Sequence, residues 1–300
     1  MRHPAPELPA FIARELPFER SLVEAGGLRL HVMEAGRGPT AVFVHGNPTW
    51  GFLWRKVAAP LAAAGLHVVL PDLPGLGLSE KPRDPSFHEL ENHARIFGAL
   101  LDEVAPGPVL FVLHDWGGPI ALAALAERTG RLAGLVVTNT GVGPPRKGAR
   151  PTPFHRFANL PIVAPAAFRL LGFPQGFLGF AQADRRSISG DVARAYRWPL
   201  RRLRDRTAPL ALARLVPVRE DHPSVAGLRR SLAVATAFEG PTEIVWGDRD
   251  PVLGRALRGV ATALPRARVT TVPAGHYLQE EAPSPVSDAV LRVARKAGLL

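Results

Sequence analysis

Short runs of apolar, often β-branched residues alternate along this chain with longer segments of helical periodicity, and this alternation constrains the fold more than any other feature. The runs have the length and composition of buried strands. They span residues Leu28–Val32, Ala41–Val44, His67–Leu70, Val109–Leu113, Gly134–Thr138, Thr242–Trp246 and Arg268–Val272. Strands and helices that alternate in this way form a mostly parallel, doubly wound sheet with helices on both faces. The sequence therefore predicts an α/β fold.

Helical segments fill the intervals between these strands. They span residues Leu53–Ala64, Ser86–Val104, Pro119–Arg128, Val225–Phe238, Leu253–Leu264 and Pro285–Lys296. Ser86 and Glu89 are spaced as a capping box, in which each side chain bonds the other residue's free backbone amide. This spacing predicts that the second helix starts at Ser86.

Residues 142–215 interrupt the alternation, because they are rich in Pro, Arg and Phe and contain helical stretches without buried-strand runs. We therefore predict one core domain formed by residues 1–141 and 216–300, with an inserted helical lid (cap) domain at residues 142–215. An insertion at this point lies over the carboxyl ends of the parallel strands, where ligands bind in such sheets.

Composition excludes several classes of protein. The chain has 300 residues and no cysteine, so disulfides, thiolate metal sites and cysteine nucleophiles are excluded. Its apolar runs are too short for a membrane helix, and its first residues lack the apolar region of a secretory signal. We therefore expect a cytoplasmic protein without membrane contact.

The formal net charge of +11 arises in one part of the chain. Residues 142–230 contain 17 Lys and Arg against 5 Asp and Glu, while the rest is close to neutral. These arginines are scattered, with few aromatic residues between them that could stack on bases. The pattern predicts a solvated, arginine-rich helical surface, and no binding of nucleic acid.

The segment from Val109 to Pro119 carries the strongest chemical signal. A predicted strand ends at His114, Asp115 follows, and Gly117 and Gly118 allow a sharp turn into a helix. This is the shape of a nucleophile elbow, in which a strained turn lifts one side chain above the sheet. Taken alone, Asp115 is equally well interpreted as a helix N-cap.

Two later segments supply partners for a nucleophile. His276 lies in a short loop between a predicted strand and a helix, and its position after the elbow agrees with the chain order nucleophile, acid, histidine. The acid is expected from the loop after the strand Thr242–Trp246. We choose Asp250 there, with Asp248 as the alternative, since Asp248 is also interpreted as a turn residue.

From about residue 18 to its end, the chain resembles the α/β-hydrolase superfamily and, within it, the haloalkane dehalogenases, a branch related to epoxide hydrolases. The segments that carry the resemblance are His45–Pro48, Asp72–Pro82, His114–Gly118 and Gly275–Glu280. It implies that Asp115 attacks the carbon that bears the halogen, and that the side-chain N–H groups of Asn47 and Trp116 hold the departing halide. It also implies an oxyanion hole formed by the backbone amides of Asn47 and Trp116. One departure is Leu113, where many elbows have Gly.

The residue types suit this chemistry. A carboxylate attacks an sp³ carbon with a good leaving group to give an alkyl ester, which water activated by His276 and Asp250 would then hydrolyse. Neither a metal nor an organic cofactor is required. We expect a small apolar halogenated substrate and a monomer or weak homodimer. Apolar residues of the lid are expected to select the substrate, and they include Phe154, Phe168, Phe173, Phe177 and Phe180.

An epoxide hydrolase is the main alternative, because it would use the same Asp115 but would need a tyrosine to protonate the alkoxide. Tyr196 lies in the predicted lid and is the candidate donor, although we favour a packing role for its ring. Asn47 favours the halide. Defluorination of fluorinated acids is less favoured, because that group has Arg where this chain has Trp116. A non-enzymatic receptor is disfavoured, since all members of the triad are present.

Overall fold

The computed structural model describes residues 1–128, 130–146 and 152–300. Within these ranges, nine strands form one sheet in the order β1-β2-β3-β5-β4-β6-β7-β8-β9. Their bounds are β1 Arg2–Pro4, β2 Glu19–Ala25, β3 Leu28–Ala35, β4 Thr40–Val44, β5 His67–Pro71, β6 Val109–His114, β7 Leu132–Thr138, β8 Thr242–Gly247 and β9 Arg268–Val272. The strands from β4 to β9 are parallel, and β1, β2 and β3 form an antiparallel edge.

The predicted mostly parallel sheet is confirmed, and each of the seven predicted strands is present. The sequence did not reveal β1 or β2. Strand β2 has the sequence ERSLVEA, and only Val23 and Ala25 in it are buried. A strand near an open edge buries too few side chains to form the apolar run on which the prediction depended.

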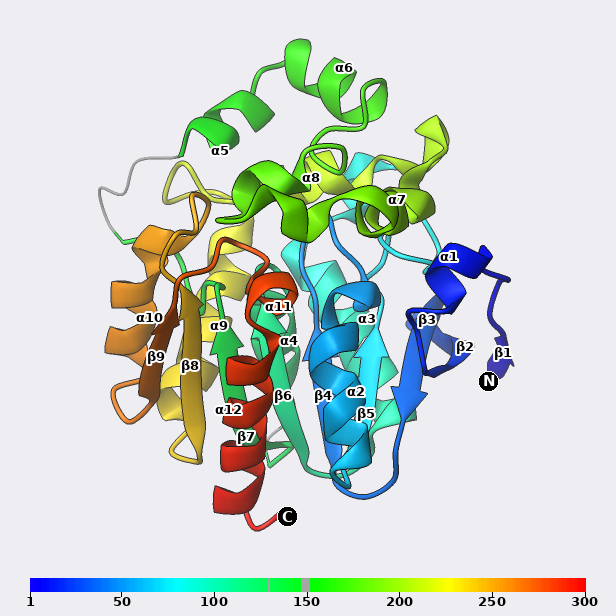
Figure 1. Ribbon diagram of the computed structural model, residues 1–300. Helices are drawn as coiled ribbons and strands as arrows, with labels where there is room; N and C mark the ends of the chain where they lie inside the picture. The colour runs from blue at the N-terminus through cyan, green and yellow to red at the C-terminus, as the bar shows by residue number, and fades with distance from the viewer. Residues whose placement is uncertain (129, 147–151) are drawn as a thin grey trace.

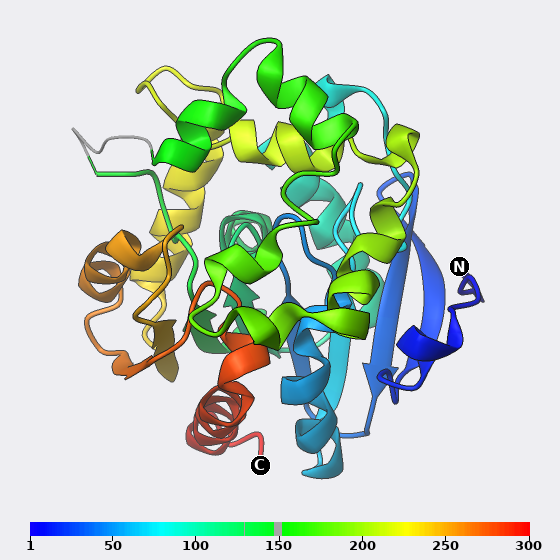
Figure 2. The ribbon, with the colours of Figure 1, turned by 45° about the horizontal axis from the view of Figure 1, so that its top comes forward.

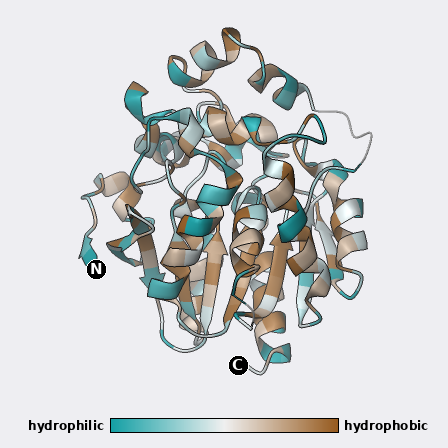
Figure 3. Cartoon of the chain, turned by 180° about the vertical axis from the view of Figure 1, so that it is seen from behind, coloured by the Kyte–Doolittle hydropathy of each residue, from teal (hydrophilic) through white to brown (hydrophobic). Residues whose placement is uncertain are grey.

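Helices cover both faces of the sheet (Figure 1). Those on one face are α2 Arg55–Ala63, α11 Leu278–Glu281 and α12 Pro283–Lys296, and those on the other are α3 Leu90–Val104, α4 Gly117–Leu125, α9 Ser224–Ala237 and α10 Leu257–Ala263. Alternate residues of the central strands fill the two cores. Phe43 and Val112 face the α12 side, whereas Val44 and Leu113 face the α4 side. In Figure 3 these strands form the apolar centre of the molecule.

Four helices lie above the carboxyl ends of the parallel strands, as Figures 1 and 2 show. They are α5 Pro153–Ala158, α6 Val163–Arg169, α7 Gly190–Arg197 and α8 Ala208–Arg214. Phe168, Ala164 and Leu210 form a small separate core among α5, α6 and α8. The predicted lid domain, residues 142–215, also contains residues 147–151, which lie outside the described residues.

Short helices complete the chain. They are α1 Ala10–Ala13 and the 3₁₀ turns η1 Gly51–Trp54, η2 Pro85–Phe87, η3 Leu178–Ala181, η4 Arg185–Ile188, η5 Trp198–Leu200, η6 Leu203–Asp205 and η7 Gly254–Ala256. Among the helices of the described ranges, none is both long enough and apolar enough to cross a membrane.

The predicted capping box at Ser86 and Glu89 is wrong. Asp84 accepts a hydrogen bond from the Ser86 backbone amide and caps η2, and α3 begins only at Leu90. Glu89 is the extended residue before α3 and makes no side-chain cap. Pro85 explains the difference, because its fixed φ suits the first position of the turn that Asp84 opens.

Candidate active site

Asp115 lies in a sharp turn between β6 and α4. Its φ of 50° is in the left-handed region, which side chains other than Gly rarely occupy and which Asp tolerates better than most. Backbone and side-chain bonds hold the turn from the β7 side. The Asp115 amide donates to the Asn139 carbonyl oxygen at 3.2 Å, and the Thr140 hydroxyl donates to the Asp115 carbonyl oxygen. The structure thus contains a strained turn of the nucleophile-elbow type.

Two glycines allow this turn to form although Leu113 replaces the more usual Gly. A Cβ atom on Gly117 would collide with the backbone carbonyls of Val44 and His45, and one on Gly46 would collide with the Asp115 carboxylate. Close approach of β4 to the elbow therefore depends on these two positions. The Asp115 side chain that results is 13% exposed.

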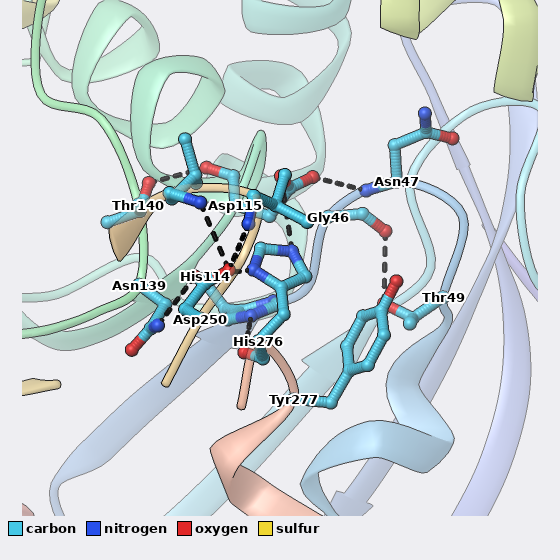
Figure 4. Close-up of polar contacts among 12 residues, drawn as sticks. Gly46, Asn47, Thr49, His114, Asp115, Asn139, Thr140, Asp250, His276 and Tyr277 are labelled. Carbon is cyan, nitrogen blue, oxygen red and sulfur yellow. Dashed lines mark hydrogen bonds and ion pairs between the residues drawn. The ribbon is translucent and has the colours of Figure 1, made fainter. Parts of the chain in front are cut away.

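His276 and Asp250 complete a row of three side chains (Figure 4). His276 Nε2 lies 3.6 Å from Asp115 Oδ2, and His276 Nδ1 lies 2.8 Å from Asp250 Oδ2. Both Asp250 and His276 are buried. Asp248, the alternative acid, is exposed to solvent. The geometry therefore favours Asp250 as the partner of the histidine.

Asp250 is held by more than the histidine. Its Oδ1 accepts hydrogen bonds from the amides of Val252 and Leu253, at 2.6 and 3.0 Å. Its Oδ2 also accepts one from Asn139 Nδ2 at 2.6 Å. Although burial disfavours its charge, His276 and these donors lower the pKa of Asp250 to about 2. No pattern in the sequence indicated Asn139 as a partner of Asp250.

The carboxylates on either side of His276 determine whether it is protonated. Burial would lower the pKa of His276, but the charge of Asp250 and hydrogen bonding to Asp115 and Asp250 raise it to about 10. The pKa of Asp115 is lowered against the effect of burial, chiefly by His276. The two carboxylates beside His276 therefore favour its protonated form.

A backbone cradle receives one oxygen of Asp115. The Asn47 amide donates to Asp115 Oδ1 at 2.7 Å, and the backbone amide of Trp116 helps to lower the pKa of this carboxyl. The side chain of Asn47 is directed elsewhere, since its Nδ2 donates to the Pro209 carbonyl oxygen in α8 at 2.9 Å. One further N–H of this amide group is left for another acceptor. Trp116 is buried at the start of α4.

The segment before η4 holds the loop that carries His276. The His276 amide donates to the Ala181 carbonyl oxygen at 2.8 Å. Gln182 pairs with Tyr277 in both directions, accepting from its amide at 2.9 Å and donating to its carbonyl oxygen at 3.1 Å. Glu281 accepts from the Gly275 amide at 2.6 Å. No pattern in the sequence indicated Gln182.

Tyr196 lies in α7 and is not part of the row formed by Asp115, His276 and Asp250. Its side chain is fully buried, and its hydroxyl donates to Glu280 Oε1 at 2.6 Å. Arg55 from α2 binds the same carboxylate, with Nη1 2.5 Å from Oε1. Tyr196 therefore joins a lid helix to two helices of the core. Its ring packs edge-on against Phe52.

The phenylalanines expected to select the substrate divide into two groups. Phe154, Phe168 and Phe173 pack together in the small core of the lid helices. Phe177 and Phe180 are exposed to solvent.

Comparisons with known proteins agree with this architecture. The family model described as "alpha/beta hydrolase fold" matches residues 39–283. A haloalkane dehalogenase of Mycobacterium marinum (strain ATCC BAA-535 / M) is 32% identical over 275 residues, with 88% of each chain covered. Haloalkane dehalogenase 2 of Mycobacterium tuberculosis (strain ATCC 25618 / H37Rv) is 30% identical over 278 residues, covering 92% of this chain and 94% of its own.

Solved structures share the fold over nearly the whole chain. Haloalkane dehalogenase DbeA from Bradyrhizobium elkani USDA94 superimposes with a TM-score of 0.81 at 25% identity, covering 94% of this chain and 98% of its own. DatA from Agrobacterium tumefaciens C58 gives the same TM-score at 23% identity, covering 94% and 97%. From the family match and the relatives at 30% identity or more, this chain belongs to the α/β hydrolases and, within them, to the haloalkane dehalogenase family.

Proposed function

We propose that this protein hydrolyses the carbon–halogen bond of small apolar halogenated substrates through an alkyl ester on Asp115. The observation that carries the proposal is that the two oxygens of this carboxylate have different surroundings. Oδ1 lies against the Asn47 amide, and Oδ2 is on the side of His276. Oδ2 attacks the carbon, a C–O bond forms, the C–X bond breaks, and the halide leaves with the bonding electron pair.

The halide needs N–H donors and a dry environment but no proton. In this proposal the donors are the indole N–H of Trp116 and the side-chain N–H of Asn47 that does not bind the Pro209 carbonyl oxygen. Hydrogen bonds to a charged group are worth about 1.5–3 kcal/mol each, so two donors make a substantial contribution to the transition state.

Alkylation also prepares the second step. Once Asp115 is a neutral ester, His276 loses one of the two carboxylates that raise its pKa, and it releases its proton more readily. Neutral His276 then deprotonates water, which attacks Cγ of Asp115. The amides of Asn47 and Trp116 stabilise the oxyanion on Oδ1. On collapse the departing alkoxide oxygen takes the proton of the new hydroxyl on Cγ, which releases the alcohol and restores the carboxylate. His276 is then protonated again, and the proton that it released before this step is the one net proton of the reaction.

The same proposal assigns a lid function to residues 142–215, whose helices lie over the strand ends. Tyr196 argues for halide over epoxide, because its hydroxyl is already bound to Glu280. An epoxide hydrolase would need a tyrosine hydroxyl at the alkoxide.

Halide release tests the proposal. Purified protein is incubated with a series of primary bromoalkanes and with a terminal epoxide, and bromide and diol are measured, with Asp115→Asn as the control. We expect bromide from the bromoalkanes and none from the variant. Diol without bromide would overturn the proposal and return Tyr196 to the role of proton donor.

A further inference from the structure

The outer surface of the lid helices combines large exposed apolar side chains with arginines. Among the described residues, eight of the twelve exposed large apolar side chains lie between residues 160 and 203. Ile162 is 80% exposed and Leu171 is 76% exposed. We name as the lid tip the apolar residues Ile162, Val163, Leu170, Leu171 and Leu203, together with the arginines Arg169, Arg201, Arg202 and Arg204.

Packing within the lid does not account for these side chains. Helix α6 already has an inner apolar face, formed by Ala164 and Phe168, which is buried against α5 and α8. Val163 at the start of this helix and the two residues that flank it, Ile162 and Leu170, remain exposed. An exposed apolar surface of this kind marks a contact site. Figure 1 shows α6 at the outer end of the molecule, far from the central sheet, and the ribbon at that end includes apolar residues in Figure 3.

The lid tip is one continuous surface, because Arg206 joins its two segments. The Arg206 guanidinium donates to the carbonyl oxygens of Arg169 and Leu170 at the end of α6, and to those of Leu200 and Arg201 beside η5. A groove of about 470 Å³ lies between the two segments. Its lining includes Leu171, Trp198, Arg197 and Arg201, so its character is both apolar and basic.

Charge decides which partner fits this surface. Residues 152–206 contain ten arginines, no lysine or glutamate, and three aspartates. One of the three, Asp191, is already paired with Arg14 and Arg194. Two copies of the chain that met through this surface would repel each other. A surface of anionic lipid would instead attract the arginines and accept the apolar side chains among its acyl chains.

We infer that the lid tip docks on anionic lipid surfaces, with Ile162, Leu170 and Leu171 inserted at the headgroup boundary and the arginines on the phosphates. This contact requires no membrane-spanning helix, and it replaces the sequence-based expectation that the protein makes no membrane contact. The role that we give to this docking rests on the proposed function. An apolar halogenated substrate concentrates in lipid, and the lid lies between the lipid and the carboxyl ends of the strands that carry Asp115.

Flotation of the full-length protein with large unilamellar vesicles tests the inference. One set of vesicles is phosphatidylcholine alone, and a second also contains about a third phosphatidylglycerol. We expect binding to the anionic vesicles only, weakening as salt is raised because charge attraction is screened. Failure to bind the anionic vesicles would overturn the inference, and it would leave bromide release, and so the proposed function, unaffected.

Three variants distinguish vesicle binding through the lid tip from attraction due to the overall positive charge of the protein. Ile162→Ser/Leu170→Ser/Leu171→Ser removes apolar contact, and Arg169→Gln/Arg202→Gln/Arg204→Gln removes three charges. The matched control Arg268→Gln/Arg295→Gln/Lys296→Gln removes three exposed charges near the opposite end of the sheet, at the start of β9 and the end of α12.

We expect the charge variant to bind about a hundredfold more weakly, since each juxtamembrane arginine contributes roughly fivefold. The apolar variant should lose at least tenfold, and the control should bind like the wild type. Equal losses in the control and the charge variant would show non-specific attraction and contradict the inference. So would a concentration-dependent dimer that the apolar variant abolishes, because the surface would then serve a second copy.

Discussion

Asp115 combines a strained backbone with a carboxylate held by charge and hydrogen bonds. Its turn was predictable, because a buried strand followed by Asp115 and by glycines at positions 117 and 118 indicates a sharp passage into a helix. The partners of Asp250 were harder to predict. The choice between Asp248 and Asp250 depended on the path of a loop, and Asn139 emerged only when β7 and β8 were placed side by side. Likewise, the bond from the Asn47 side chain to Pro209 crosses from the core to the lid, a contact that short-range patterns do not encode.

The indole N–H of Trp116 is expected to support the departing halide. Trp116→Phe keeps an aromatic ring and removes the donor, so bromide release from a bromoalkane should fall by about 10- to 100-fold, the worth of one hydrogen bond to a charged group. Trp246→Phe is the matched control, because its buried indole N–H has no hydrogen-bond partner among the described residues. Equal activity in the two variants would exclude Trp116 as a donor.

Because His276 titrates, the free energy of unfolding of the protein should depend on pH. Its pKa is raised from an unfolded value near 6.5 to about 10, so its protonated form stabilises the fold. This contribution is fully present below pH 6.5 and is lost as pH rises toward 10, at no more than about 1.4 kcal/mol per pH unit. Denaturant unfolding of the wild type and His276→Gln at several pH values measures it. We expect the difference in unfolding free energy to shrink between pH 6.5 and 10, and a constant difference would contradict the charge state described above.

At the level of helices and strands, the segment Ala181–Gln182 positions the loop that carries His276. Seven of the nine strands and the longer helices of the core could be predicted, because each has a local apolar period. The start of α3 could not, since Asp84 and Pro85 form a turn that competes with the capping box. The contact of residues 181–182 with the His276 loop joins positions almost a hundred residues apart, and no local pattern indicates it.

Gln182→Leu tests this positioning. The substitution removes both bonds to Tyr277, and the step that needs His276 should slow while alkylation of Asp115 does not. A rapid burst of about one bromide per protein, followed by turnover reduced at least tenfold, is the expected result in rapid-mixing kinetics. Gln175→Leu is the control, because Gln175 is also buried in the lid and lies outside the bonds to this loop. If Gln182→Leu slowed the burst and the later turnover equally, its role would be general packing.

For the whole molecule, the buried group Arg55, Glu280 and Tyr196 ties the lid to the core. It joins α7 of the lid to α2 and α11, and Lys56 adds a further contact to Glu280 at 3.0 Å. The doubly wound sheet and the inserted helices were predictable from the order of the segments. The attachment of the insertion was not, because it depends on a hydrogen bond from Tyr196 to Glu280, 84 positions away, and Glu280 is itself held by an ion pair with Arg55, 225 positions away.

Tyr196→Phe should therefore lower stability and spare the chemistry. Loss of a buried hydrogen bond to a charged carboxylate is worth about 1.5–3 kcal/mol, which is a decrease of several degrees in Tm. Calorimetry measures the change, and bromide release per folded protein should remain within about twofold of the wild type. A large loss of turnover at unchanged Tm would instead place the hydroxyl in the reaction.

The proposed reaction passes through a covalent ester on Asp115, and this ester can be trapped. His276→Gln, which lacks the base, is incubated with 1-bromobutane and digested, and the peptides are analysed by mass spectrometry. We expect one butyl group on Asp115, about one bromide per protein, and no further turnover. Continued turnover without modification, or a butyl group on another residue, would contradict the proposed reaction.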